Sequence, residues 1–221
     1  MKYWLRYSKT GLMRFVGHLD TLHHWERILR RANLPLAFSQ GFSPHPLLSV
    51  AAPLPVGQTS LAEYLELELR EELQPADLIA AIKPALPEGM DLLGAVAVPA
   101  GVKALMSLVR FAEYRITGSQ TEDLSGRVQA LLEKECYLLT VKRKSGQKEV
   151  NIRPFVRNLA VDSDDQLRAC LATGSRGNLR PEDLWRAVTG GELPQSIQRL
   201  ELYLGSDDRL LTPWQLVEAE A

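Results

Sequence analysis

Cysteine is scarce in this sequence, which has only Cys136 and Cys170 among its 221 residues. The two are far apart and form no CxxC pair. Zinc and iron–sulfur sites built from cysteine need several closely spaced thiolates. The chain therefore has no cysteine-built metal centre of its own. Both cysteines lie in apolar, strand-like runs, and we expect both to be core residues.

Long apolar runs are also missing. No stretch approaches the 18 or so apolar residues that a membrane helix needs, and the opening KYWLRYSKTG is too polar for a secretory leader. We therefore expect a cytoplasmic protein without a membrane partner. Net charge is only −1, so no overall field attracts nucleic acid or lipid. The proportions of 45% apolar and 24% charged residues are those of an ordinary globular protein.

Charge is unevenly distributed along the chain. Residues 1–60 contain seven lysines and arginines against two acidic residues, whereas residues 61–91 are acidic. A basic face can therefore exist on a nearly neutral protein.

The apolar periodicity predicts an α+β protein. In residues 1–99 it indicates strands at 2–8, 47–54, 62–70 and 90–98, with helices at 18–32 and 76–83. This is the β-α-β-β-α-β order of a ferredoxin-like domain. After the linker 99–101 the pattern repeats, with strands at 105–117, 137–143, 150–161, 167–173 and 197–204, a helix capped by Thr121 and a helix at 181–188. We predict two tandem ferredoxin-like halves, 1–99 and 104–205, the second with an extra β-hairpin, followed by an acidic tail at 206–221.

Helix 18–32 is expected to have two different faces. Leu22, Trp25, Ile28 and Leu29 fall on one side and should pack on the first sheet. The other side collects His23, His24, Arg27, Arg30 and Arg31 around Asp20, and His18 opens the helix. Three arginines with two histidines suit phosphate binding, although plain solvation and an Asp20–His24 pair are alternatives.

The loop after this helix contains the segment SQGFSPHP, residues 39–46. Its glycine and prolines exclude helix and central strand, and an ordered loop of this length usually has a function. We take Ser39, Gln40, Gly41, Phe42 and His45 as candidate substrate- or anion-binding residues. The alternative is a loop that only packs.

All four histidines lie between His18 and His45. We expect the SQGFSPHP loop to return over the N-terminal end of helix 18–32, which would bring His18 and His45 into one site. The two could then act as an acid–base pair, as in metal-independent RNA cleavage. No HxH or HExxH spacing supports a metal site with Asp20, and we assign no metal.

Two further basic features occur in the second half. The turn TGSRGN at 173–178 precedes a helix, so its backbone N–H groups and Arg176 could hold an anion, or the glycines could serve the turn alone. A cluster around a predicted hairpin could contact a nucleic-acid backbone or simply be solvated: Lys142, Arg143, Lys144, Lys148, Arg153 and Arg157.

The stretch FVGHLDTLHHWERILRRANLPLAFSQGFSPHPLLSVAAPLPVG, with SLAEYLELEL after it, resembles the bacterial radical-SAM-linked family. The NIRP at 151–154 and the NLRPEDL at 178–184 match its second half. The resemblance implies a radical SAM protein as partner, with the iron–sulfur cluster and S-adenosylmethionine bound in that partner and no cofactor in this chain.

Together these features favour an accessory protein that presents RNA, tRNA or rRNA, to the radical SAM enzyme. An RNA-processing enzyme using His18 and His45, or a purely structural subunit, are the alternatives.

Overall fold

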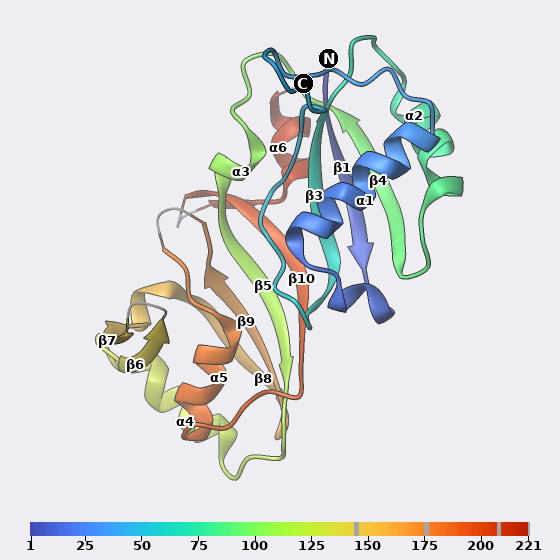
Figure 1. Cartoon of the computed structure of the whole chain (residues 1–221). Coiled ribbons are helices and arrows are strands. Elements are labelled where there is room, and N and C mark those ends of the chain that lie inside the picture. Colours follow the sequence, from blue (N-terminus) through green and yellow to red (C-terminus); the bar gives the residue numbers. More distant parts are fainter. Residues whose placement is uncertain (144–145, 175–176, 207–208, 221) are drawn as a thin grey trace. The chain divides into compact units, whose positions relative to one another are not determined.

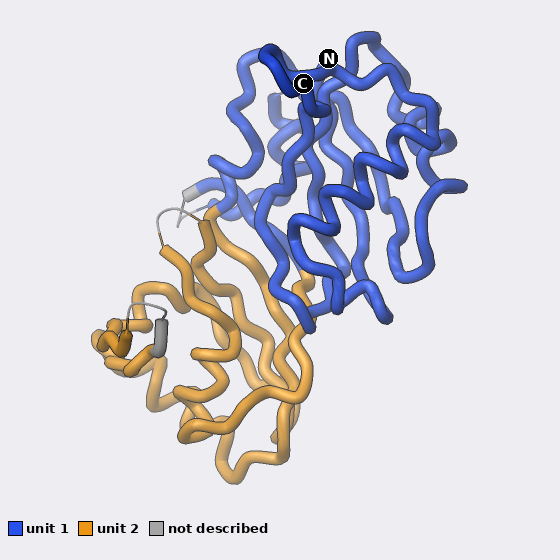
Figure 2. The backbone as a smooth tube through the Cα atoms, viewed as in Figure 1, with its two compact units in different colours: residues 1–109, 201–221 blue, residues 110–200 orange. Residues whose placement is uncertain are grey.

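The computed structural model describes residues 1–143, 146–174, 177–206 and 209–220. The chain forms two compact units, the first made of residues 1–109 and 201–221 and the second of residues 110–200 (Figure 2). This division differs from the predicted one, because the end of the chain belongs to the first unit. Both units are mixed α+β.

The first unit is built on the sheet order β4-β1-β3-β10, with β2 paired to β3 and β11 paired to β10. Its regular elements are β1 (Lys2–Lys9), η1 (Gly11–Phe15), α1 (His18–Arg31), β2 (Leu48–Val50), β3 (Thr59–Glu68), α2 (Pro75–Ile82), η2 (Lys83–Ala85), β4 (Met90–Ala97), α3 (Leu105–Leu108), the end of β10 (Ser196–Ser206), β11 (Arg209–Leu211) and α6 (Pro213–Glu220). The pairs β1–β3, β1–β4, β2–β3 and β10–β11 are antiparallel. The element order β-α-β-β-α-β follows the sequence prediction, although β2 is shorter than expected.

Helix α1 lies across one face of this sheet (Figure 1). Alternation in β1 turns Tyr3, Leu5 and Tyr7 toward the helix, where they share a core with Trp25, Ile28 and Leu29. Tyr7 and Trp25 meet edge to face at 4.9 Å between ring centroids. The predicted apolar face of helix 18–32 is therefore confirmed, with Leu22 at its partly buried margin.

The opposite face of the sheet is covered by the segment that we expected to be only an acidic tail. Helix α6 places Trp214 against Tyr64, with ring centroids 5.6 Å apart. Gly94 of β4 permits this approach, because a Cβ there would lie 3.0 Å from the Trp214 ring. Pro213 and Val217 of the same helix are buried, so the end of the chain packs on the sheet and is not a solvated tail.

The second unit has the sheet order β10-β5-β9-β8 and a separate hairpin, β6-β7. Its elements are β5 (Val109–Thr117), α4 (Leu124–Leu132), β6 (Leu138–Arg143), β7 (Gly146–Asn151), η3 (Arg153–Phe155), β8 (Val156–Ser163), β9 (Gln166–Ala172), α5 (Pro181–Thr189) and the start of β10. The pairs β5–β9, β6–β7 and β8–β9 are antiparallel. Two predicted strands were wrong in part. Residues 105–108 are helical, and residues 150–161 are divided by η3, where Pro154 cannot donate a ladder hydrogen bond.

Local polar contacts explain other details of the second unit. Asp123 caps α4 by accepting a hydrogen bond from the Gly126 N–H at 3.1 Å, so the predicted cap, Thr121, was wrong. In the NIRP segment, the Asn151 side chain accepts from the backbone N–H groups of Tyr137 and Arg153. This motif therefore closes a turn.

No helix in the described part of the chain is long and apolar enough to cross a membrane. Cys170 is buried as expected, but Cys136 is exposed, because it lies in the turn between α4 and β6 and not in a strand. Burial, reinforced by the Glu113 carboxylate, raises the pKa of the Cys170 thiol to about 12.

The two thiols should therefore react at very different rates. At pH 8 we expect a disulfide reagent such as Ellman's reagent to modify Cys136 rapidly, and Cys170 only after denaturation, because the reactive thiolate is suppressed at Cys170. Absorbance at 412 nm measures the released chromophore. A Cys136→Ser variant should lose the fast phase, and two fast thiols in the native protein would contradict the assignment.

Candidate functional site

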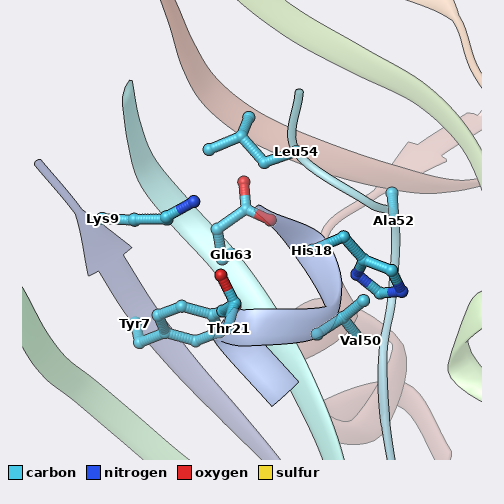
Figure 3. A pocket seen from close by; sticks show the side chains of 8 residues that line it. All are labelled: Tyr7, Lys9, His18, Thr21, Val50, Ala52, Leu54 and Glu63. Atoms are coloured by element: carbon cyan, nitrogen blue, oxygen red, sulfur yellow. The ribbon is translucent and has the colours of Figure 1, made fainter. Parts of the chain in front are cut away.

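A small pocket lies under the first turn of α1 (Figure 3). Its volume is about 10 Å³, roughly the space needed by one water molecule. Strands β1 and β3, helix α1 and the segment after β2 all contribute to it. The lining residues are Tyr7, Lys9, His18, Thr21, Val50, Ala52, Leu54 and Glu63.

Two charged side chains are buried in this pocket. Lys9 is 1% exposed and Glu63 is 2% exposed. The Lys9 Nζ donates a hydrogen bond to the Val16 carbonyl at 2.6 Å, and its amine points toward the Glu63 carboxylate (Figure 3). Buried charges cost several kcal/mol unless they are compensated. The Lys9 amine and the Glu63 carboxylate face each other in a region that water hardly reaches.

Helix α1 supplies the remaining polar groups. The Thr21 hydroxyl is turned back to the Gly17 carbonyl at 2.9 Å, and His18 lies half-buried beside Val50 and Ala52 (Figure 3). Carboxylate, amine and imidazole in one pocket form a set suited to proton transfer. The pocket admits one water molecule but no organic substrate, so any such chemistry involves only water or a group reaching in from outside.

Our sequence analysis missed Lys9 and Glu63, although a signal was present. Lys9 continues the alternation Tyr3, Leu5, Tyr7 by two residues, and Glu63 continues Leu67 and Leu65 in the opposite direction. Each thus occupies a core-facing position that the strand pattern reserves for an apolar residue. A charge at such a position indicates a buried polar site.

The SQGFSPHP loop forms a tight hairpin. Phe38 and Pro46 face each other in a β-bridge, and the Ser39 N–H donates to the His45 carbonyl at 2.9 Å. The Ser39 hydroxyl also bonds His45 Nδ1 at 2.9 Å and accepts from the His45 N–H at 3.1 Å. Gln40, Gly41 and Phe42 at the tip are exposed, and the Phe42 side chain is fully exposed.

This hairpin lies at the wrong end of α1 for a site shared with His18. Leu36, just before it, bridges to Leu69 beyond the end of β3, whereas the His18 pocket contains Glu63. Six strand residues separate these positions, or about 20 Å. Only the returning segment through Val50 and Leu54 reaches the start of the helix (Figure 1). The predicted return of the loop over the helix N-terminus was wrong, because the chain crosses to the far end of β3 before it turns.

Because His18 and His45 lie at opposite ends of α1, the two histidines do not form the predicted acid–base pair. His45 is exposed and held by Ser39, and His18 faces the Lys9–Glu63 pocket. Asp20 is exposed on α1. Among the residues that the structure describes, no three His, Cys, Asp or Glu side chains gather as metal ligands.

The basic face of α1 borders a groove. The groove has a volume of about 610 Å³ and is lined by residues of α1 and of the segment from α2 through η2 to Pro87. One wall holds His24, Arg27 and Arg31, and the other is apolar: Ala81, Pro84, Ala85, Leu86 and Pro87. The Asp20 backbone carbonyl, and not its carboxylate, accepts from His24 Nδ1 at 2.7 Å. Arg30 is exposed beside the groove.

The predicted sites of the second unit receive less support. The Arg153 guanidinium donates to the carbonyls of Leu132 and Val156 at 3.2 and 3.1 Å, so it caps the C-terminal end of α4. Arg153 therefore has a structural role at the end of α4, and its predicted role in anion binding stays a prediction. Arg176, the candidate of the glycine-rich turn, lies outside the described residues.

Comparison with known families identifies the family of this chain. A family model described as "Uncharacterized protein conserved in bacteria (DUF2344)" matches residues 2–181. The chain belongs to this family. No curated protein matches the sequence. The family description names no radical SAM enzyme, so the predicted partnership stays a prediction.

Solved structures show a likeness of fold. One chain of the structure "Crystal Structure of a Cbf5-Nop10-Gar1 Complex" aligns with 98% of this chain at a TM-score of 0.50 and 11% identity. This chain covers 54% of that chain, about half of its length. At such identity the likeness concerns the fold alone.

The coupling of Lys9 and Glu63 can be measured by a double-mutant cycle. Lys9→Met and Glu63→Leu should each lower the free energy of unfolding by about 3 kcal/mol, because each leaves the other charge buried without its counterpart. In the double variant, the free energy of unfolding should fall by clearly less than the sum of the two single losses. Urea unfolding followed by circular dichroism gives these values. Additive losses would show that the two groups do not interact.

Proposed function

We propose that the protein binds single-stranded RNA in the groove between α1 and the α2–η2 segment and presents it to a radical SAM enzyme. One observation carries the proposal: a groove of about 610 Å³ has a wall of His24, Arg27 and Arg31 facing an apolar wall. Guanidinium groups bind phosphates, while apolar and proline surfaces accommodate unstacked bases. Neither wall alone suits a nucleic acid, but the pair does.

The nearly neutral net charge is compatible with this function, because the basic residues are concentrated. Arg27, Arg30 and Arg31 are all exposed within one turn and a half of α1. Phosphate contacts provide most of the affinity of such sites, so binding should depend on salt. Within this proposal the RNA is a tRNA or an rRNA.

We propose that the SQGFSPHP hairpin is the surface that contacts the radical SAM protein. The proposal rests on the resemblance to the radical-SAM-linked family and on the fully exposed Phe42 ring. Three hydrogen bonds between Ser39 and His45 fix the hairpin that presents this ring. An aromatic side chain held out on a rigid turn loses little entropy when it enters a pocket.

We further propose that both units are ferredoxin-like. The strand orders β4-β1-β3-β2 in the first unit and β10-β5-β9-β8 in the second support this, as does the element order β-α-β-β-α-β. The hairpin β6-β7 would then be an insertion in the second half.

Removing two groove arginines should weaken RNA binding. We expect Arg27→Ala/Arg31→Ala to lose about ten-fold or more in affinity at 100 mM salt, and to lower the slope of log K against log salt by about 1.4, at ~0.7 per lost phosphate contact. Fluorescence anisotropy of a labelled unstructured RNA 12-mer, titrated at several salt concentrations, measures both quantities.

The matched control is Arg127→Ala/Arg186→Ala, which removes the same charge from exposed arginines of α4 and α5. This variant should bind like the wild type. If the two double variants bind RNA with equal affinity, the RNA does not lie in the groove. If the wild type binds no RNA, or binds it with an affinity that does not depend on salt, the proposed function is refuted.

The hairpin can be tested separately. Phe42→Ser should weaken the complex with the radical SAM protein by about ten-fold or more, as for an aromatic anchor. RNA affinity should not change, because no residue of the hairpin lines the groove. Gel filtration and biolayer interferometry with the co-expressed enzyme would measure this. The control is Leu193→Ser, at another exposed apolar position, which should not change this affinity. If Phe42→Ser binds the radical SAM protein as tightly as the wild type does, the assigned contact is excluded.

A further inference from the structure

A patch of exposed apolar side chains surrounds the start of α1. Leu12, Phe15, Leu19 and Val56 are 81, 58, 68 and 60% exposed. They come from two segments that are joined, because the Gly57 N–H donates to the Arg14 carbonyl at 2.8 Å. Val56 also lies next to Gly17, where a Cβ would be 3.9 Å from its Cγ2. Exposed apolar groups gathered in this way indicate a binding surface.

The patch contains a cation–aromatic pair of Arg14 and Phe15. The Arg14 guanidinium carbon lies 4.8 Å from the centroid of the Phe15 ring, and both side chains are exposed. The backbone beneath them is fixed. Met13 is buried, and Val16 is held by the Lys9 ammonium. The pair is therefore presented on a rigid support, which lowers the entropy cost of stacking a ligand on it.

We propose that this patch, the α1 platform of Leu12, Arg14, Phe15, Leu19 and Val56, stacks a nucleobase of the bound RNA. This inference rests on the proposed function and extends it to a second contact. Aromatic rings and guanidinium planes are the usual stacking partners of unpaired bases. The Asp20 carboxylate, next to Gly17 at the edge of the patch, can accept a hydrogen bond from a base amino group.

The charge of the neighbouring surface favours RNA over an apolar protein. Leu19 is followed along the exposed side of α1 by His23, Arg27 and Arg30, which lie within about 80° of one another at 100° per residue. The rise from Leu19 to Arg27 is about 12 Å. A strand whose phosphates contact Arg27 can therefore place a nearby base on Phe15.

The test compares two fluorescein-labelled 12-mers by anisotropy: an RNA of mixed sequence and the same strand with abasic central nucleotides. The Phe15→Ala variant should bind the RNA about five-fold or more weakly, which corresponds to the lower end of the energies of base–aromatic stacking. The same variant should bind the abasic strand with the affinity of the wild type. Leu138→Ala, which shortens an apolar side chain of similar exposure in the second unit, should alter neither affinity. Phe15→Trp, which keeps an aromatic face, should retain RNA affinity.

The outcomes separate this inference from the proposed function. If Phe15→Ala binds both strands like the wild type while Arg27→Ala/Arg31→Ala loses affinity, the platform is refuted and the groove stands. Equal loss on both strands, or loss with Phe15→Trp as well, also refutes stacking. If Phe15→Ala instead weakens only the complex with the radical SAM protein, the patch is a protein contact. No RNA binding by the wild type refutes both proposals.

Discussion

The hydrogen bond from the buried Lys9 ammonium to the Val16 carbonyl determines where α1 begins. Lys9 is the last residue of β1, and Val16 lies two residues before α1, so this one contact ties the strand end to the helix start. It survives burial because the amine faces the Glu63 carboxylate. The direction of α1 over the sheet, and with it the groove and the platform, depends on this contact.

Much of the fold could be predicted from the sequence, because the apolar periodicity of the strands and helices matches the residues that are buried. Alternation in β1 and the spacing of Trp25, Ile28 and Leu29 on α1 describe the same core from both sides. The failures occur where tertiary contacts override local preference. Trp214 orders the supposed tail through Tyr64 and Gly94, and Asn151 closes a turn within a supposed continuous strand. Neither contact has a periodic pattern that a sequence reader could detect.

The candidate site was predicted less well, for a geometric reason. Clustering of histidines along the sequence suggested proximity of His18 and His45, and an extended segment was long enough to reach back along the helix. The chain is long enough for the SQGFSPHP loop to return to the start of α1, but length alone does not decide which path the chain takes. The selection is made by backbone pairing of Leu36 with Leu69 and of β2 with β3, which carries residues 48–50 to the helix start and leaves His45 at the other end.

That separation suits a protein that presents a substrate. The hairpin and the groove both depend on α1 and β3, yet Phe42 projects from one end of the helix and Phe15 from the other. No hairpin residue lines the groove, and the platform lies at the start of α1, a helix about 21 Å long, so an RNA strand along α1 and a protein on the hairpin need not compete. The buried Lys9–Glu63 pair keeps that spacing fixed, because a shift of α1 would expose two charges to an apolar core. Rigidity of the scaffold is thus one contribution that these buried charges make to the proposed function.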